Sequence, residues 1–546
     1  MTLHRNALIV GAVALSAVLA ACGGSGGSTP SSSATSTGGS VEFVSTTPAA
    51  TGDIEAVSWN LPYEPTSIDP AYSFNYAENT VDANLCESLL RLNPDFSITP
   101  ALAKSFSHPT PTTWVYKLRQ GVTFWDGSPM TAADVVFSLK RGADPDVGSY
   151  FGTYFANVKD IVATDSSTVT VTLNGPDALF NQAMSTAAGA IVQEAFTKSA
   201  GKDFGSPSKG VMCTGPFRFD SWKSGDRLVV TRNAAYWDDA LKAKAATLTF
   251  RFISDETTAV NALRSGEIDG EFFYLPPAGI NELKNSDTGT LYLGKSLVFW
   301  ALVGASETGP YADPKVREGF SLAIDRPAVA KVVFQDTASP AKSLTDPAYF
   351  SYGAEVFQKA YDALPANNAN FEEAKKLIAE AGGTSAGITI GVQGSSAVHE
   401  QTGSLLKAAG DALGVPVTIK TIPVDQYGAV YSDPKAREGL DAFLTTWYGN
   451  VPDPLDVYGL FTKGGFNNFN NYTAVDSAVA EARAIDDPAA RAAKVADIMT
   501  QVTKDSPWTP LEVLPVLAYM NNRVTGATVS SAYLYYPWAA GLGKAG

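Results

Sequence analysis

After residue 300 the sequence alternates between strand-like and helix-like stretches, and this alternation limits the possible folds more than any other feature. The strand-like runs are GITIGV (387–392), VPVTIKTI (415–422) and DAFLTTW (441–447), and a helical pattern at about 396–413 separates the first two. Strands that alternate with helices of about 10 to 15 residues predict a largely parallel sheet with helices on both faces. We therefore expect an α/β fold.

Several helix starts can be located from capping patterns. Thr131 is followed three residues later by Asp134, which is a capping-box pattern before an apolar stripe. The stretch 371–383, FEEAKKLIAEAGG, predicts a helix with an ion pair between Glu372 and Lys376. Two further helices are predicted where a proline follows a capping aspartate: Asp313 with Pro314, and Asp325 with Pro327.

The N-terminus has the form of an export signal over residues 1–21. Its apolar run has only about 15 residues, whereas a membrane span needs about 20. The small residues before Cys22 resemble the cleavage box of bacterial lipoproteins, which implies acylation of Cys22 and anchoring at the outer face of the cytoplasmic membrane; an ordinary signal with an incidental cysteine is the alternative. Residues 22–52, rich in Gly, Ser, Thr and Pro, predict a flexible linker.

Composition and cysteine usage restrict the class further. The formal net charge of −15 argues against nucleic acid and against adhesion to anionic lipid. No later segment offers 18 uncharged apolar residues, so we expect the rest of the chain to be soluble. Outside the cytosol the remaining pair, Cys86 and Cys213, favours a disulfide, and two unpaired buried thiols are the alternative.

Several stretches match the residue pattern of a catalytic or metal-binding motif but lack the flanking structure or the second ligand that the motif requires. GTLYLGKS (289–296) has the spacing of a phosphate loop, but a strand-like stretch follows it where a helix is required. GTSAG (383–387) has the letters of a serine-hydrolase elbow, but it joins a helix to a strand instead of a strand to a helix. Ser385 is therefore interpreted as a turn residue. HEQTG, from His399, lacks the second histidine of a zinc protease. His399 is predicted on a solvated helix face. With His108 as the other histidine beyond the leader, we expect no catalytic residues, metal site or cofactor.

The loop after 441–447 is the first candidate binding site, because ligands lie at the carboxyl ends of parallel strands. Trp447, Tyr448, Gly449 and Asn450 emerge there. Tyrosine and tryptophan combine a flat apolar surface with a polar group, as binding sites prefer. Aromatic residues that merely cap the core are the alternative.

A long stretch, PALAKSFSHPTPTTWVYKLRQGVTFWDGSPMTAADVVFSLKR (100–141), resembles the family 5 extracellular solute-binding proteins, the oligopeptide, dipeptide and nickel-binding class of ABC importers. Four further segments carry the same resemblance: EPTSIDPAYS (64–73), CTGPFRFDSWKSGD (213–226) with RNAAYWDD (232–239), DPKVREGFSLAIDR (313–326) and WYGNVPDP (447–454). The resemblance implies a two-lobed fold like that of type II periplasmic binding proteins, with an extra subdomain and a hinge between the lobes.

The resemblance also implies the domains and the partners. The large lobe would comprise residues 53–299 and 516–546, with the subdomain at about 97–210, and the second lobe residues 300–515. A solute would bind between the lobes, and a monomeric receptor would deliver it to the transmembrane subunits of an ABC permease. No catalysis is then required, in agreement with the failed motifs.

One departure from the family pattern bears on the solute. Peptide-binding members carry an aspartate for the peptide ammonium at the position of Asn450, and a neutral amide leaves a buried ammonium without its charge partner. Asp453, between two prolines, is interpreted as shaping the turn. Three further candidate contacts follow the Asp69-Pro70 pair, with a surface loop as the alternative: Phe74, Asn75 and Tyr76.

Three alternatives to a peptide receptor stay open. A non-peptide solute such as an oligosaccharide or a metal chelate would suit aromatic walls and a neutral Asn450. A secreted hydrolase would need a nucleophile with a base, which the motif order opposes. A structural envelope protein would bind no solute.

Overall fold

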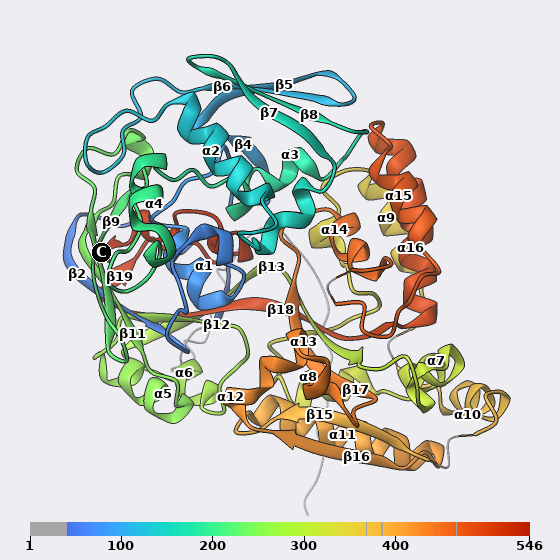
Figure 1. The fold of residues 1–546 in the computed structure, drawn as a ribbon. Helices are drawn as coiled ribbons and strands as arrows, with labels where there is room; N and C mark the ends of the chain where they lie inside the picture. Colours follow the sequence, from blue (N-terminus) through green and yellow to red (C-terminus); the bar gives the residue numbers. More distant parts are fainter. Residues whose placement is uncertain (1–40, 367, 384–385, 466) are drawn as a thin grey trace, which may run out of the picture. The chain divides into compact units, whose positions relative to one another are not determined.

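The structure is a computed structural model that describes residues 41–366, 368–383, 386–465 and 467–546 (Figure 1). The predicted export signal over residues 1–21, the predicted acylation site Cys22 and most of the predicted linker lie outside the described residues. Ser385 of the hydrolase-like motif lies outside them as well. Among the described residues no helix is long and apolar enough to cross a membrane.

One sheet of twelve strands organises the described residues. From edge to edge its main path is β16 (Val417–Ile422), β15 (Ile388–Gln393), β17 (Ala442–Tyr448), β13 (Gly289–Gly304), β18 (Trp508–Asn521), β12 (Gly270–Phe273), β2 (Ile54–Leu61), β11 (Ala245–Phe252), β10 (Arg227–Arg232) and β9 (Phe217–Lys223). Two short strands complete it: β1 (Val41–Phe43) beside β13, and β14 (Ser339–Pro340) beside β18.

The α/β class is confirmed. The prediction of parallel pairing holds for the three strands on which it was based, β15, β16 and β17, but the sheet as a whole is mixed. Strand β15 is parallel to β16 and β17, and β2 is parallel to β11 and β12. Strand β13 is antiparallel to β17 and β18, and β9, β10 and β11 form an antiparallel run. Short connections such as that between β9 and β10 force antiparallel pairing, because a parallel crossover needs about a dozen residues or more.

The predicted helix starts are confirmed at their capping residues. Helix α2 (Ala132–Ala143) has the full capping box of Thr131 and Asp134. Asp313 and Asp325 cap α7 (Pro314–Leu322) and α8 (Arg326–Val332). Besides α2 and α7, the helices of eight or more residues are α5 (Glu256–Ser265), α9 (Ala354–Ala363), α10 (Phe371–Glu380), α11 (Ala397–Leu413), α15 (Asp476–Arg483) and α16 (Pro488–Asp505).

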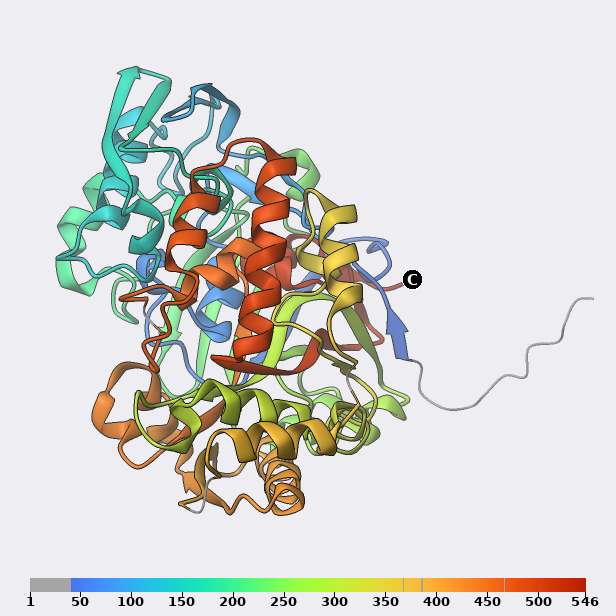
Figure 2. The same ribbon diagram turned by 90° about the vertical axis from the view of Figure 1, so that its right-hand side faces the viewer.

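The shorter helices lie mainly in connections between larger elements. They are α1 (Tyr76–Asp82), α3 (Phe180–Ala183), α4 (Glu194–Ala200), α6 (Ile280–Lys284), α12 (Val424–Tyr427), α13 (Ala429–Ser432) and α14 (Pro454–Tyr458). Helices α9 and α15 pack on α16, and the three stand side by side in Figure 2. Helix α14 also packs on α15 and α16, and this packing fixes the position of the turn at residues 449–453 that precedes it.

Two side-chain predictions on the helices are wrong. Lys376 of α10 pairs with Glu373 at 3.2 Å rather than with Glu372, because the three-residue spacing brings Glu373 within reach on the exposed face. His399 is buried in α11 instead of solvated: its ring meets Trp300 and Tyr427 edge to face, and its Nδ1 accepts the Gln393 N–H. Burial lowers the pKa of His399 to about 3, so the ring is neutral.

A separate four-stranded antiparallel sheet lies within the predicted subdomain at about 97–210. Its order is β5 (Ala103–Thr110), β6 (Thr113–Leu118), β8 (Thr168–Leu173) and β7 (Val158–Asp165). Helix α2 packs on β7 and β8, as the top of Figure 1 shows. Two small two-stranded sheets lie elsewhere: β3 (Leu90–Leu92) with β4 (Ile98–Pro100), and β19 (Val524–Thr525) with β20 (Gly543–Lys544).

The prediction that residues 22–52 form a linker is wrong for its last part. The Val44 N–H donates to the Leu293 carbonyl, and the Thr51 N–H donates to the Lys544 carbonyl. Thr47 is buried, and its hydroxyl oxygen accepts the N–H groups of residues 526 and 527. Backbone pairing with distant strands fixes this segment, although its composition alone cannot supply a core.

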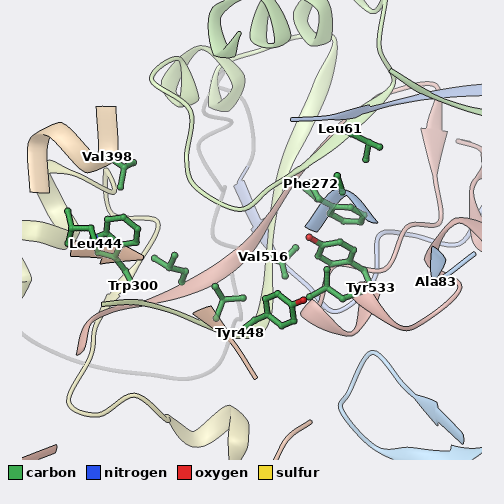
Figure 3. Close-up of a cluster of buried hydrophobic side chains, with 14 of the residues drawn as sticks. Leu61, Ala83, Phe272, Trp300, Val398, Leu444, Tyr448, Val516 and Tyr533 are labelled. Carbon is green, nitrogen blue, oxygen red and sulfur yellow. The ribbon is translucent and has the colours of Figure 1, made fainter. Parts of the chain in front are cut away.

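Buried side chains run without a break across the centre of the main sheet (Figure 3). Trp300 and Leu444 lie at one end and Phe272 and Tyr533 at the other, with Tyr448 between them. The phosphate-loop look-alike at 289–296 lies wholly within β13, so no helix follows it and its rejection is confirmed.

A disulfide joins Cys86 and Cys213, whose Cα atoms lie 5.0 Å apart. Cys86 follows α1, and Cys213 precedes β9. The bridge therefore ties the end of the first helix to the segment that leads into the edge of the main sheet.

Candidate functional site

The loop after β17 begins on the buried central strands. Tyr448 is the last residue of the strand and pairs with Val298 of β13. At Gly449 the chain passes so close to Tyr349 that a Cβ atom would lie 2.5 Å from the tyrosine ring, so only glycine fits there. The Gly449 N–H donates to the Leu297 carbonyl at 2.9 Å, which fixes the direction in which the loop leaves the sheet.

Two of the predicted aromatic residues face opposite sides of the sheet. Tyr448 belongs to the central buried group, whereas Trp447 is half-buried on the other face, edge to face with Trp508. Alternation of side chains along a strand makes this separation unavoidable. The structure therefore brings Tyr448, but not Trp447, to the remaining candidates.

Tyr448 contacts the segment around residue 74. Its hydroxyl donates to the Phe74 carbonyl at 2.5 Å and accepts from Asn79 Nδ2 at 2.9 Å. Its ring tilts against that of Tyr76, with centroids 5.3 Å apart. Residues nearly four hundred positions apart in sequence thus meet side by side.

Phe74, Asn75 and Tyr76 lie at the start of α1. Phe74 is 42% exposed and stacks on Tyr150, with centroids 5.0 Å apart. Tyr76 is half-buried and stacks on Tyr274, and burial raises the pKa of its hydroxyl. Asn75 is exposed and precedes α1 without a side-chain capping bond.

Asn450 lies at the centre of a chain of hydrogen bonds. Its Nδ2 donates to the Tyr154 hydroxyl at 3.0 Å, and its Oδ1 accepts the Tyr535 hydroxyl at 2.6 Å. The side chain is only 7% exposed. Both ends of the amide are therefore engaged by the protein itself.

Asp456, on α14, completes this chain. One carboxylate oxygen accepts the Tyr154 hydroxyl, and the other accepts the Asn450 backbone N–H at 2.8 Å. Burial raises the pKa of Asp456 to about 6, and the bonds from Tyr154 and Asn450 limit that rise. The inner cluster, as we name Tyr154, Asn450, Asp456 and Tyr535, thus joins three segments far apart in sequence.

Asp453 shapes the turn, as predicted. It is fully buried and caps α14 through the Leu455 N–H at 3.0 Å. Gln182 Nε2 and the Tyr352 hydroxyl also donate to its carboxylate, at 2.8 and 3.0 Å. Both carboxylate oxygens of Asp453 are therefore hydrogen-bonded within the protein.

Sequence reasoning missed three members of the inner cluster. Asp456 carried a weak signal, since it lies three residues after Asp453 in the first turn of α14, which begins with the same Asp-Pro pattern as α7. Tyr154 and Tyr535 carried none, because nothing in their local sequence relates them to the loop. Among the described residues no group of three or more His, Cys, Asp or Glu side chains could hold a metal ion.

The comparison with protein families decides the identity. The model for bacterial extracellular solute-binding proteins, family 5, matches residues 97–469, more than half of the chain. The chain belongs to this family. Known members of family 5 are binding proteins, and the family is extracellular.

This family 5 protein resembles characterised members over most of its length. It is 27% identical over 500 residues to the periplasmic oligopeptide-binding protein OppA of Salmonella typhimurium, covering 88% of each chain. It is 26% identical over 474 residues to the glutathione-binding protein GsiB of Escherichia coli K12, covering 84% of this chain and 89% of that one.

Solved structures confirm the type II periplasmic-binding-protein fold. AppA of Bacillus subtilis, solved with a nonapeptide, has a TM-score of 0.76 at 19% identity, covering 91% of this family 5 chain and 100% of AppA. AgaA of A. tumefacien R10, solved with agropinic acid, has a TM-score of 0.77 at 22% identity, covering 89% and 98%. Proteins of one fold thus hold quite different solutes.

Proposed function

We propose that the protein is the extracytoplasmic receptor of an ABC importer and that it binds a peptide between two lobes. One observation carries the proposal: aromatic and polar side chains from four distant segments, some buried and some half-buried, meet around the loop after β17. The segments lie at residues 74–79, 150–154, 448–456 and 535. Such a site can hold a solute without catalysing a reaction. Among the similar proteins, OppA is an oligopeptide-binding protein, GsiB is a glutathione-binding protein, and AppA was solved with a nonapeptide.

The lobes of this proposal are residues 53–299 with 516–546, and residues 300–515. Strands β13 and β18 pass from one to the other, and their pairing is interrupted between Gly294 and Val298. Opposite this gap lies Pro515, which has no backbone N–H to donate. A ladder with missing bonds bends more readily than a continuous one, so these two strands would form the hinge, and a solute touching both lobes would favour closure.

The proposal extends to the membrane and to the partner. Cys22 would carry a lipid anchor at the outer face of the cytoplasmic membrane, and a monomeric receptor would pass its solute to the transmembrane subunits of the permease. A chain with a net charge of −15 would be held near an anionic membrane by the lipid rather than by its surface.

A non-peptide solute is the second candidate, and a specific observation favours it. The Asn450 amide is held between the Tyr154 and Tyr535 hydroxyls, whose oxygen atoms can still accept hydrogen bonds from a hydroxyl-rich solute. The agropinic acid bound by AgaA indicates that the fold accepts such ligands.

Native mass spectrometry of the full-length chain, purified without denaturant, tests the proposal. A ladder of bound masses assignable to short peptides is expected. One discrete non-peptide mass would instead establish the second candidate, and a chain that carries and accepts no solute would contradict both.

A further inference from the structure

Asp456 is an interior carboxylate that has no cationic partner, unlike Asp69 and Asp177. Asp69 pairs with Arg141, and Asp177 pairs with Arg483. Asp456 accepts only neutral donors, and no Lys, Arg or His of the described residues lies within ion-pair distance of it. Interior charges are normally paired, so an unpaired one needs an explanation.

Asp456 also keeps contact with solvent-accessible space. It is half-buried, whereas Asn450 is 7% exposed and has both ends of its amide engaged. Tyr150 and Tyr535 are half-buried beside it, and the negative charge of Asp456 adds to burial in raising the pKa of Tyr150. A solute that reaches this place therefore meets the carboxylate and the tyrosine rings rather than the amide.

Two other buried aspartates are less suited to a solute. Asp453 is fully used: three neutral donors hold its carboxylate, and the charge of Arg491 opposes the rise of its pKa on burial. Asp82 has no hydrogen-bond partner, but it is 4% exposed in a cavity of about 10 Å³, which has room for about one water molecule.

We propose that Asp456 receives a cationic nitrogen of the solute, an ammonium or guanidinium group. This inference rests on the proposed function and adds that the solute is positively charged where it meets the inner cluster. A cation there would form charge-assisted hydrogen bonds with the carboxylate. Asp456 would then decide which solutes bind.

The hydrogen-bond directions give Asn450 a positioning role. The Tyr154 hydrogen is donated to Asp456, so the Tyr154 oxygen must accept from Asn450 Nδ2, and Asn450 Oδ1 is left to accept from Tyr535. A neutral residue at 450 thus keeps both tyrosines in place. Asn450→Asp would instead place a second carboxylate at the same tyrosine, and one of the two acids would take up a proton.

The test measures solute choice by native mass spectrometry of the full-length chain, after its co-purified ligand has been removed. Three mixtures of short synthetic peptides are offered. The first has free amino ends and no Lys or Arg, the second is the same set N-acetylated, and the third is N-acetylated with one lysine in each peptide. The first and third distinguish an amino end from a side chain as the source of the cation.

We expect the wild-type chain to retain the first or third mixture at least about tenfold better than the second, and Asp456→Asn to abolish that preference. The double variant Asn450→Asp with Asp456→Asn should not restore it, because the side chain at 450 is buried between Tyr154 and Tyr535 and does not face the solute. Asp505→Asn is the matched control, since Asp505 also accepts a tyrosine hydroxyl, that of Tyr472 at 2.6 Å, away from the site. It should leave the preference unchanged.

The contrary results are distinguishable. Equal retention of all three mixtures by the wild-type chain would overturn the cation inference and leave the peptide receptor standing. Retention of no peptide would overturn the peptide receptor and this inference with it. An unchanged preference in Asp456→Asn would show that another group receives the cation.

Discussion

Residues 150–182 meet residues 450–483 at several places, and two of these contacts differ in charge balance. At the first, Arg483 donates twice to the buried Asp177, at 2.7 and 3.3 Å, and its backbone carbonyl accepts the Ala178 N–H. At the second, Asp456 has only the neutral donors of the inner cluster. The first contact is complete without a solute, whereas the second lacks a positive charge. The ion pair should therefore stabilise the empty protein, and the inner cluster should respond to what binds.

The largest effect on stability should come from the disulfide, and it should leave solute choice unaffected. Replacing Cys86 and Cys213 by serine should lower the free energy of unfolding by about 4 to 5 kcal/mol, because the bridge closes a loop over a separation of 127 residues. Urea denaturation followed by tryptophan fluorescence measures the loss. The preference for cationic peptides should persist at low temperature, and a lost preference would show that α1 must be clamped for recognition.

The ion pair should come next. Arg483→Leu leaves Asp177 buried without its cation and should cost about 3 kcal/mol in the free energy of unfolding. The double variant with Asp177→Leu removes both charges and should recover most of that loss. If the double variant is no more stable than the single one, the contact owes its strength to packing rather than to charge.

Features that depend on residues close together in sequence were predictable, whereas features that depend on residues far apart were not. Local patterns such as the Thr131 and Asp134 box or the Asp313 cap were predictable, because the residues that make them are neighbours in sequence. The antiparallel pairing of β13 with β18 was not predictable in this way, because the two strands lie far apart in sequence and no local pattern relates their directions. The buried His399 shows the same limit, since Trp300, which covers it, lies on β13.

The residues of the candidate site show the same difference between local and distant contacts. The loop, including Tyr448, was found from the rule on strand ends, and Tyr76 from a resemblance, and the structure places their rings together. Asn450 was singled out from the sequence, but its partners were not identified, because the Tyr154 and Tyr535 hydroxyls reach it from distant segments. The sequence could show that Asn450 replaces the aspartate of peptide-binding members. It could not show that the Asp456 carboxylate lies beside Asn450, because Tyr154 links the two side chains from a distant segment.

A moderate effect is expected at Asp456 itself, and it depends on pH. An aspartate has a pKa of about 3.9 in the unfolded chain, and that of Asp456 is about 6 in the fold, so the folded state binds the extra proton between these values. Stability of the empty protein should thus fall as pH rises from about 4 to about 6, by about 2 kcal/mol in total. Asp456→Asn lacks this loss and should be the more stable protein at pH 7 but not at pH 4.

Urea denaturation of both proteins at the two pH values, with the co-purified ligand removed, measures that difference. A cationic peptide should reverse the ranking at pH 7, because it stabilises only the wild-type carboxylate. Equal stability of the two empty proteins at pH 7 would contradict the unpaired charge, and the contrast with the Asp177 contact would disappear.

The smallest effect should come from Tyr154→Phe, which keeps the ring and removes one hydroxyl. Asp456 loses a donor and Asn450 Nδ2 loses an acceptor, so about 1 kcal/mol of stability should be lost at pH 7. The Tyr154 bond lowers the pKa of Asp456, so without it the pH range over which stability falls should move upward. Cationic peptides should still be preferred, because the charge that selects them remains on Asp456. If the preference disappears while that pH dependence is retained, the Tyr154 hydroxyl contacts the solute directly, and recognition belongs to the tyrosine rather than to the carboxylate.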